Sequence, residues 1–309
     1  MLIPTHNRRE ILARTLESLA AVRIPAGVNV DLTVVANGCT DGTEKMVAEH
    51  APSLPFPARC VVEPELGVAH ARNRCVKEGT GQIFAFLDDD IWADPAWLEG
   101  LLEVFESQPA DFVMGRVTLW WEAVQPPEWL NEEIEAHLSA KDHGAEVKEL
   151  RRGGDAISAN LAFTREAAAR IGPFKTGLGR KGGKGLLGGE ETDWVARGLA
   201  EGLRMFYAPK AWVKHWVPAH RIELPYLDGV AFGHGYGHVI MKESFSKGEV
   251  LSLWWRGLFL RLKCRLRETG CALSGNRKAR MHHRMRRMKG RGWCQASWER
   301  FWGAKPPNT

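Results

Sequence analysis

An uninterrupted apolar run, residues 83–87, ends directly in three aspartates, Asp88, Asp89 and Asp90. A run without a polar residue is typical of a strand that is covered on both faces, as in a parallel sheet. Open parallel sheets bind their ligands in the crevice beyond the carboxyl ends of the strands. The sequence therefore predicts that the three aspartates lie at a ligand-binding edge.

Strand-like and helix-like segments alternate on either side of this run. Asn7, with Glu10 three residues later, resembles a capping box that opens the first helix. Such alternation implies an α/β fold with a doubly wound, mostly parallel sheet. The expected strands are 2–3, 32–36, 56–62, 112–117, 157–163 and 205–213, and the expected helices after the first are 44–50, 67–77, 95–105, 165–171 and 191–200.

The adjacent carboxylates need a partner. Like charges this close repel one another by about 4 kcal/mol per pair at an intermediate dielectric, so water or a cation must offset the repulsion. Carboxylate oxygens at a strand end suit Mg²⁺ or Mn²⁺, which also bridge to substrate phosphates. The alternative is an N-cap for the helix that follows Pro95. That alternative accounts for Asp94 and leaves the three preceding acids unexplained.

Charge is distributed unevenly along the 309 residues. Residues 242–309 carry 17 lysines and arginines against 4 acids, a net charge of +13, whereas residues 1–241 carry 25 against 33, a net charge of −8. The six cysteines lack the C-x-x-C spacing of a metal site and the density of a disulfide scaffold, so we expect reduced thiols and a cytoplasmic protein. We expect no signal peptide and no membrane span, because no apolar stretch reaches roughly 20 residues.

The basic C-terminal region contains an amphipathic stretch. Apolar residues recur at helical spacing (Leu251, Trp255, Leu258, Leu262, Leu266) and basic residues share another face (Arg256, Lys263, Arg267). A further basic run occupies 277–292. Basic residues near an anionic bilayer contribute about 1 kcal/mol each, so we expect peripheral membrane contact through 249–292.

Two alternatives stay open for this region. The apolar stripe packs on the catalytic domain or on a second subunit of a homo-oligomer, and the basic run is only solvated. No nucleic-acid-binding motif accompanies the charge, so nucleic acid is not an expected partner.

Six short motifs occur in the order in which they are found in family 2 glycosyltransferases. They are LIPTHNR, NGCTDGT, GVAHARN, FLDDD, ISANLAFTREAAARIGPF and LGGEETDWVARGLAEG, and they span residues 2–202. The chain thus resembles this family, and the resemblance implies a GT-A fold, a nucleotide-sugar donor, Mn²⁺ or Mg²⁺, and transfer with inversion at the anomeric carbon. The stretch LGRKGGKGLLGGEE is also similar to stretches in bacterial exopolysaccharide transferases.

The resemblance assigns roles position by position. Asp88 matches the first, ribose-binding acid of the D-x-D motif, and Asp90 matches its metal ligand. The other expected donor contacts are Pro4, Thr5 and Asp41 at the base and ribose, Arg72 and Asn73 beside the nucleotide, and Asn7 and Asp89 in the same site. His215 stands where GT-A enzymes often place a metal-binding histidine, and a structural histidine is the alternative.

Inverting transfer needs a base for the acceptor hydroxyl, and a carboxylate of raised pKa suits this role. Glu190, Glu191 and Asp193 are the candidates in GGEETDW. By the resemblance Glu191 takes the place of the aspartate in the family's Glu-Asp pair, so it is the predicted base, with Asp193 in reserve. Acids are also common in the first turn of a helix, where the dipole lowers their pKa, and this is the structural alternative.

We predict a metal-dependent inverting glycosyltransferase that adds a sugar, from a UDP-sugar as the favoured donor, to a glycan or lipid-linked acceptor in surface polysaccharide synthesis. The expected catalytic domain covers 1–221, with nucleotide-sugar binding in 1–117 and acceptor binding and catalysis in 118–221. A helical basic region, 222–309, follows. The glycine-rich basic stretch 179–188 suits a loop that closes over a diphosphate, and a loop that is only solvated is the alternative.

Two other functions fit parts of the sequence. A sugar nucleotidyltransferase shares the acids at the strand end, but PTHNRRE lacks the glycine-rich basic signature expected after the first strand. A non-catalytic glycan-binding or membrane-scaffold protein would keep its function after Glu191→Gln. The chain also departs from the family, because Cys39 replaces serine, His6 replaces tyrosine, and the short stretch before Pro4 implies a stunted first strand or a start upstream.

Overall fold

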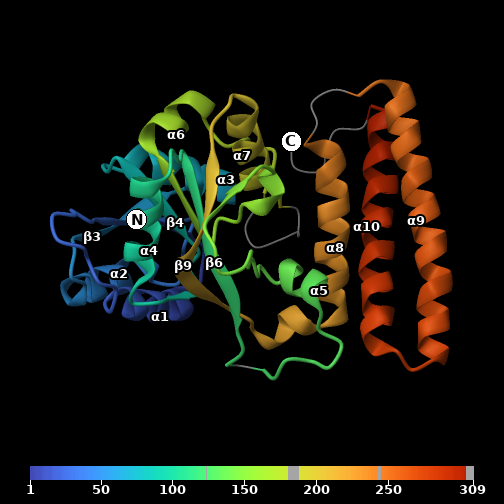
Figure 1. Ribbon diagram of the computed structural model, residues 1–309, viewed down its shortest axis with the longest axis horizontal. Helices are drawn as coiled ribbons and strands as arrows, with labels where there is room; N and C mark the ends of the chain where they lie inside the picture. Colours follow the sequence, from blue (N-terminus) through green and yellow to red (C-terminus); the bar gives the residue numbers. More distant parts are fainter. Residues whose placement is uncertain (123, 180–187, 242–244, 304–309) are drawn as a thin grey trace.

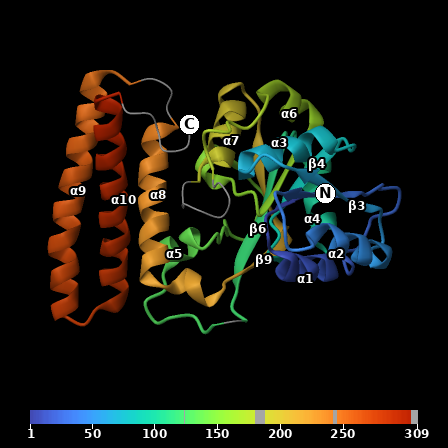
Figure 2. The same cartoon turned by 180° about the vertical axis from the view of Figure 1, so that it is seen from behind.

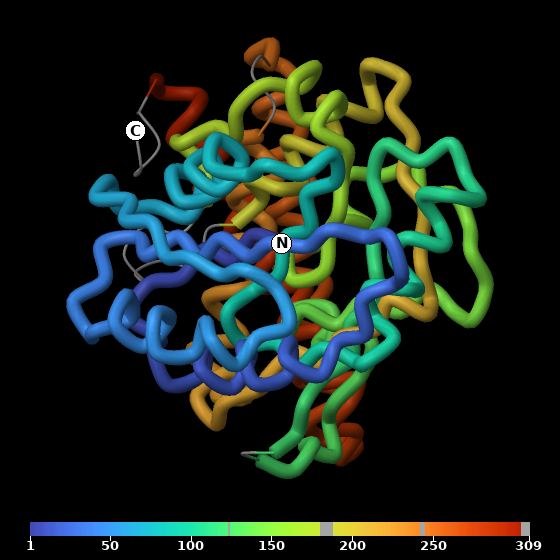
Figure 3. Tube along the Cα trace, turned by 90° about the vertical axis from the view of Figure 1, so that its left-hand side faces the viewer, coloured from blue at the N-terminus to red at the C-terminus, as the bar shows by residue number. Residues whose placement is uncertain are grey.

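In the computed structural model, which describes residues 1–122, 124–179, 188–241 and 245–303, a mixed β-sheet with helices on both faces adjoins a bundle of three long helices (Figure 1). The N-terminal half of the chain lies at the end of the molecule away from the bundle. Figure 2 shows the same order from behind, with α8 next to the sheet, then α10, and α9 outermost. In Figure 3 the N-terminal half faces the viewer and the bundle lies behind it.

The first half of the sheet is parallel. Its strands run in the order β3 (Ala58–Glu63), β2 (Leu32–Asn37), β1 (Leu2–Thr5) and β4 (Ile83–Leu87), and each neighbouring pair is parallel. Helices α1 (Arg9–Leu19), α2 (Thr43–His50) and α3 (Val68–Glu78) connect them. Every residue of β2 and all but the first of β4 are buried, because these strands are covered on both faces.

The second half of the sheet is mixed. β8 (Asn160–Thr164) lies antiparallel to both β4 and β6 (Phe112–Trp120). β9 (Met205–Trp216) is parallel to β6 and antiparallel to the short strands β5 (Ile91–Ala93) and β7 (Lys148–Leu150). Helices α4 (Trp97–Ser107), α6 (Arg165–Ile171) and α7 (Glu190–Ala200) complete this half. The expected α/β sheet with a helical C-terminal appendage is therefore confirmed.

One large apolar core fills the space between the sheet and its helices. Leu12, Leu16 and Leu19, spaced along one face of α1, are at most 1% exposed. Trp97 at the start of α4 is fully buried, and its indole Nε1 donates to the Oδ1 atom of Asn160 (2.8 Å). Because that buried polar atom has a partner, the large ring adds apolar contact without an unpaired donor.

The predicted capping box at the start of α1 is wrong. Asn7 lies outside the helix with φ at +51°, and its Oδ1 accepts a hydrogen bond from the backbone N–H of Thr40 (2.7 Å). The first helical N–H, that of Arg9, donates instead to Asp41 Oδ2 (2.9 Å). A carboxylate from the turn after β2 thus satisfies a helix end that a local side chain usually caps.

The C-terminal bundle consists of α8 (Leu224–Ile240), α9 (Lys247–Leu273) and α10 (Arg277–Phe301). Met281, Met285 and Met288 of α10 are buried against α8 and against the short helix α5 (Glu132–His137). This second apolar cluster contains residues from both sides of the boundary predicted after residue 221.

Three further expectations concern the chain as a whole. All six cysteines are free thiols. Within the described part of the chain, the structure contains no helix of the length and apolarity needed to cross a bilayer. The loop predicted to close over a diphosphate, 179–188, lies outside the described residues except for its two ends.

Candidate active site

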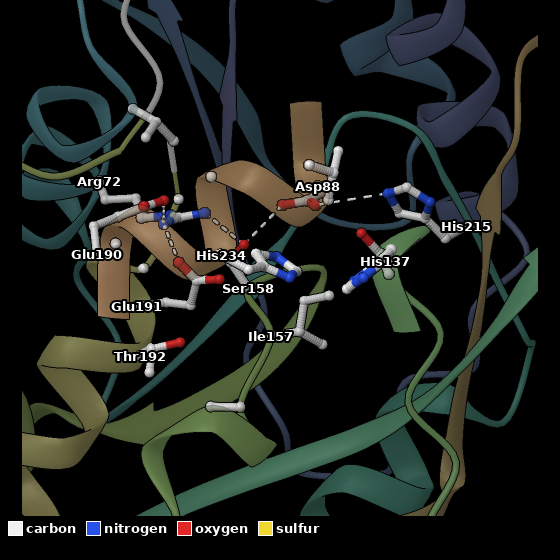
Figure 4. A pocket seen from close by; sticks show the side chains of 18 of the residues that line it. Arg72, Asp88, His137, Ile157, Ser158, Glu190, Glu191, Thr192, His215 and His234 are labelled. Atoms are coloured by element: carbon white, nitrogen blue, oxygen red, sulfur yellow. Dashed lines mark hydrogen bonds and ion pairs between the residues drawn. The ribbon is translucent and has the colours of Figure 1, made fainter. Parts of the chain in front are cut away.

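A pocket of about 660 Å³ opens beyond the carboxyl ends of β1 and β4. Residues after β1, the three aspartates after β4 and the start of α7 line it on the sheet side, and α8 lines it on the bundle side (Figure 4). This is the crevice that open α/β sheets offer to ligands, and its volume suits a small-molecule substrate.

Asp89 is turned toward the protein interior and both its oxygens are paired. Thr5 Oγ1 donates to Oδ2 (2.6 Å), and Arg8 Nη1 donates to Oδ1 (2.7 Å). Burial raises the pKa of Asp89 to about 6, against the opposing charge of Arg8. We interpret Asp89 as the residue that positions Thr5 and Arg8, because its oxygens are already in use.

Asp90 is fully buried between two arginines. Its Oδ2 accepts hydrogen bonds from Arg8 Nη2 (2.7 Å) and Arg221 Nη2 (3.0 Å). Burial opposes its ionisation, but the positive charges of Arg8 and Arg221, with the adjacent His215, outweigh burial and hold the pKa of Asp90 well below its usual range. Asp90 is therefore a carboxylate, and its second oxygen, Oδ1, faces His215 Nε2.

Asp88, Asp90 and His215 form a candidate cation site. One ligand atom from each lies within 4.8 Å of the others, and His215 Nε2 is 3.2 Å from Asp90 Oδ1 and 3.9 Å from Asp88 Oδ2. Two carboxylates and an imidazole whose ligand atoms lie this close together are a donor set that suits Mn²⁺ or Mg²⁺. The residues present thus fit a divalent cation.

His215 lies within β9 rather than after it, paired with Ile91 of β5. The sheet itself, rather than a loop, brings this side chain over the aspartates, and the residue is only 2% exposed.

A second carboxylate pair, Glu190 and Glu191, stands in the first turn of α7. Arg72 of α3 forms an ion pair with Glu190 and lies 3.5 Å from Glu191 Oε2. Burial raises the pKa of Glu191 to about 7, and the adjacent negative charge of Glu190 adds to this, against the opposing charge of Arg72. The expectation that the helix dipole lowers this pKa is therefore wrong, because burial and like charge are stronger here.

Arg72 also connects the two acidic groups of the pocket. Its Nη2 donates to Ser158 Oγ (2.5 Å), and Ser158 Oγ donates to Asp88 Oδ1 (3.2 Å). Figure 4 shows this chain from Glu190 through Arg72 and Ser158 to Asp88. This series of contacts fixes the start of α7 relative to the candidate cation site.

Asp193 is not among the residues that line the pocket. Its carboxylate binds Lys175 Nζ (2.9 Å) and Arg197 Nε (3.0 Å), so it ties α7 to its surroundings. This placement does not favour Asp193 as the reserve base.

The other predicted donor contacts are divided between several places. Pro4, Thr5 and Arg72 line the pocket, whereas Asn7 and Asp41 line a neighbouring hollow of about 450 Å³. Asn73 lines neither, because its amide exchanges hydrogen bonds with the backbone of Phe174 (2.8 and 3.0 Å).

Several residues of the pocket were not predicted from the sequence. Arg8 and Arg221 contact Asp90 across 82 and 131 residues of chain, and no local pattern announces such contacts. A signal did exist for the bundle side, since GHGYGH places His234 and His238 four residues apart, on one face of a helix.

The fold and the pocket together define a GT-A type transferase. A family model supports this, since the model of glycosyl transferase family 2 matches residues 1–169. The chain belongs to this family and is a glycosyltransferase, so the nucleotidyltransferase and scaffold alternatives are set aside.

Two curated relatives align over most of the chain. Succinoglycan biosynthesis protein ExoM of Rhizobium meliloti (strain 1021) is 32% identical over 232 residues, which cover 75% of this chain and 71% of the relative. A glucosyl-dolichyl phosphate glucuronosyltransferase of Haloferax volcanii is 27% identical over 237 residues, covering 76% and 73%.

A solved structure has a similar fold. The mannosyltransferase PcManGT from Pyrobaculum calidifontis, in complex with GDP-Man and Mn²⁺, matches with a TM-score of 0.66 at 19% identity, covering 96% of this chain and 86% of that chain. This likeness extends the shared fold beyond the family match into the C-terminal region.

Proposed function

We propose that this enzyme transfers a sugar from a nucleotide-sugar, with a UDP-sugar as the favoured donor, to a glycan or lipid-linked acceptor with inversion at the anomeric carbon. The observation that carries the proposal is that one pocket holds both Glu191, a carboxylate of raised pKa, and the candidate cation site. A base for the acceptor and positive charge for the leaving group are the two requirements of such a displacement.

The names of the relatives support the setting. One is called a succinoglycan biosynthesis protein and the other a glucosyl-dolichyl phosphate glucuronosyltransferase, so one name refers to a glycan and the other to a lipid-linked sugar. We place this enzyme in surface polysaccharide synthesis on that ground.

In the proposed mechanism Glu191 accepts the proton of the acceptor hydroxyl as that oxygen attacks the donor sugar. Its raised pKa makes it a stronger base than an exposed glutamate, which favours proton transfer near neutral pH. Arg72 forms an ion pair with the neighbouring Glu190 and holds α7 in place. Pro4 and Thr5 face the nucleoside.

Asp88, Asp90 and His215 would hold Mn²⁺ or Mg²⁺, which supplies positive charge next to the diphosphate when bound. Arg8 and Arg221 keep Asp90 ionised and oriented for this role, since both bind its other oxygen. A solved structure of similar fold contains Mn²⁺ with its nucleotide-sugar, which supports the choice of metal.

The test is an assay with a panel of nucleotide-sugars, Mn²⁺ and lipid-linked oligosaccharides, which measures release of nucleoside diphosphate and the anomeric configuration of the product. We expect a β-linked product from an α-linked donor. In Glu191→Gln we expect kcat to fall by about 100-fold or more. Glu201→Gln, an exposed carboxylate-to-amide control at the end of the same helix, should keep its kcat. A product of retained configuration, or an unchanged kcat in Glu191→Gln, would contradict the proposal.

The outer face of α9 is the proposed membrane contact. Its most exposed apolar residues, opposite the side that packs on α10, form a row: Leu251, Trp255, Phe259, Leu262, Leu266 and Leu273. Arg256, Lys263 and Arg267 are exposed along one flank of this row. An apolar row beside positive charge complements an anionic bilayer, which we propose as its occupant.

The basic run 277–292 contributes less to that face than its sequence predicts. Arg284 pairs with Asp228 (2.6 Å) and Arg287 with Glu268 (2.8 Å), so part of its charge is neutralised inside the bundle. Its three methionines are buried. The proposed contact is therefore centred on α9, and peripheral association at the inner face of the cell membrane is the localisation that we propose.

A further inference from the structure

The pocket has a polar wall beside Glu191, apart from the candidate cation site. Four residues of this wall line the pocket, and they come from three segments: Ser139 and Lys141 follow α5, Gly154 lies in a short 3₁₀ helix, and Thr192 follows Glu191 in α7. We call Ser139, Lys141, Gly154 and Thr192 the Lys141 wall. Figure 4 shows Thr192 together with Glu191 in the pocket.

Lys141 is anchored at its backbone and at its side chain. Its N–H and C=O exchange hydrogen bonds with Val117 of β6 (2.8 Å each), and its Nζ donates to the carbonyl oxygen of Gly154 (2.8 Å). Among the residues that the structure describes, Lys141 forms no ion pair. An ammonium group has three N–H donors, so two are left for a ligand.

Gly153 brings the 3₁₀ helix η2 (Gly153–Asp155) against the start of α7. A Cβ atom on Gly153 would lie 2.5 Å from the carbonyl oxygen of Thr192. The two elements therefore touch through their backbones, a distance that only glycine permits. Because Lys141 is bound to η2, this contact places its ammonium group near the turn of α7 that carries Glu191.

Ser139 occupies a position that glycine usually takes. α5 ends in a Schellman motif, in which the N–H of Ser139 donates to Ala136 O (3.2 Å) and the N–H of Ala140 donates to Glu135 O (2.8 Å). The φ angle of Ser139 is +81°, which is costly for a residue with a Cβ atom. A serine stands at this place in the pocket although glycine would be less strained, and strain of this kind is concentrated at functional sites.

The Lys141 wall offers hydrogen-bond donors and acceptors at one place. The Lys141 ammonium group donates, the Gly154 carbonyl accepts, and the hydroxyls of Ser139 and Thr192 do both. Adjacent hydroxyl groups of a sugar ring need this combination, because each hydroxyl donates one hydrogen bond and accepts others. The chemistry of the wall therefore suits a sugar ring.

The charges near the wall favour an uncharged ligand. Burial lowers the pKa of Lys141, and the negative charges of Asp155 and Glu191 oppose that effect. Two acids thus already act on the one ammonium group of the wall. A negatively charged ligand would be repelled by both acids, whereas an uncharged ligand meets no such repulsion.

We propose that the Lys141 wall binds an uncharged sugar ring of the acceptor, and that the Lys141 ammonium group donates to a hydroxyl next to the one that reacts. The inference rests on the proposed function, in which Glu191 accepts the proton of the acceptor hydroxyl. The Gly154 carbonyl and the hydroxyls of Ser139 and Thr192 bind other groups of the same ring. A ring held in this way presents one hydroxyl to Glu191, which directly precedes Thr192 in α7.

The experiment is an NMR titration of methyl glycosides against the protein saturated with Mg²⁺ and the nucleoside diphosphate that binds most tightly. The uncharged probes are the methyl β-glycosides of glucose, galactose, mannose and N-acetylglucosamine, and methyl β-glucuronide is the anionic probe. At least one uncharged glycoside should bind, and Lys141→Met should weaken its binding at least about 10-fold. Lys141→Arg, which keeps a donor, should weaken it less, and Lys278→Met, an exposed lysine on α10, should leave it unchanged.

Deoxy analogues of the tightest glycoside identify the hydroxyl that Lys141 binds. In the native protein, removal of that one hydroxyl should weaken binding about as much as Lys141→Met does. In Lys141→Met, the same deoxy analogue should bind as well as the parent glycoside, because the interaction has already been lost. A merely structural role of Lys141 would instead weaken the binding of every analogue by the same factor.

Several results would overturn the inference. They are binding that Lys141→Met leaves unchanged, a uniform loss across the deoxy series, no binding by any glycoside of the panel, and a glucuronide that binds at least 10-fold more tightly than every uncharged glycoside. Lys141→Met should keep the affinity for the nucleoside diphosphate, and an equal loss of that affinity would assign Lys141 to the donor instead. Failure of the proposed function is separate, since it appears as nucleoside diphosphate binding that does not depend on Asp90.

Discussion

Two neighbouring glutamates at the start of α7 have different environments and different roles. Glu190 is 4% exposed and forms a close ion pair with Arg72. Glu191 lies 3.5 Å from the same guanidinium, so its interaction with Arg72 is weaker. The negative charge of Glu190 then raises the proton affinity of Glu191.

This difference predicts the pH dependence of catalysis. With a pKa of about 7, Glu191 is a carboxylate above neutral pH and loses its ability to accept a proton below it. We expect kcat/KM to fall about tenfold per pH unit below pH 7. Glu190→Gln removes the neighbouring negative charge and frees Arg72 to approach Glu191, so the acid limb of the profile should move to lower pH.

The measurement is a pH profile of kcat/KM for both proteins, with Glu103→Gln, an exposed carboxylate on α4, as the control. An acid limb that stays in place in Glu190→Gln would contradict the assignment of Glu191.

Helices and strands could be predicted from the sequence where a local pattern of apolar residues marks them. The strands β2 and β4 and the helices α3 and α6 were predictable, because their apolar periodicity reports burial directly. α8 was covered only by the general prediction of a helical region 222–309. Its bounds were not predicted, since its three alternating glycines at 233–237 weaken helix propensity and its apolar residues lie on all sides of the helix. That same helix forms one wall of the pocket.

The residues of the candidate site likewise fall into two groups, those that could be predicted and those that could not. Asp88, Asp90 and Glu191 lie in short motifs of the family, so resemblance located them. Arg221 and Ser158 act on them from distant elements, and such long-range contacts leave no mark in a local pattern. The capping prediction failed for a related reason, because Asp41 reached the helix end from another loop.

The glycine contacts between α8 and α10 make a prediction about stability. Gly292→Ala should destabilise the protein by about 1 to 3 kcal/mol, because its Cβ would overlap backbone atoms of α8. Gly270→Ala, in α9, meets no atom within 4 Å and should stabilise the helix by about 0.5 to 1 kcal/mol. Urea unfolding of the two variants compares the effects. Equal free energies of unfolding would show that the crossing tolerates a side chain.

In the whole molecule, α8, which lines the pocket, is the bundle helix next to the sheet, and α9, which carries the exposed row, is the outermost helix (Figure 1). Helices packed side by side are about 8 to 10 Å apart, so membrane contact through α9 would leave the pocket roughly 20 Å or more from the bilayer. An acceptor glycan with several sugars between the lipid and the reacting hydroxyl fits this arrangement.

The membrane proposal predicts selective binding to anionic vesicles. The protein should co-sediment with vesicles that contain phosphatidylglycerol and much less with pure phosphatidylcholine, and added salt should weaken the binding. Phe259→Ser with Leu266→Ser should abolish it, because both residues are prominent in the exposed row, at 68% and 76%. Val147→Ser, an exposed apolar residue far from α9 in the sequence, is the control. A concentration-dependent dimer that the double substitution disrupts, without vesicle binding, would assign the face to a second subunit instead.

We propose that Asp88, Asp90 and His215 hold a cation to which the donor diphosphate binds, and calorimetry of the protein with a panel of nucleoside diphosphates tests this site. We predict that binding requires Mn²⁺ and that Asp90→Asn, which keeps the shape of the buried side chain, removes the contribution of the metal while Glu103→Gln does not. Tight binding of a nucleoside diphosphate without metal, or a metal dependence that persists in Asp90→Asn, would contradict the proposed cation site.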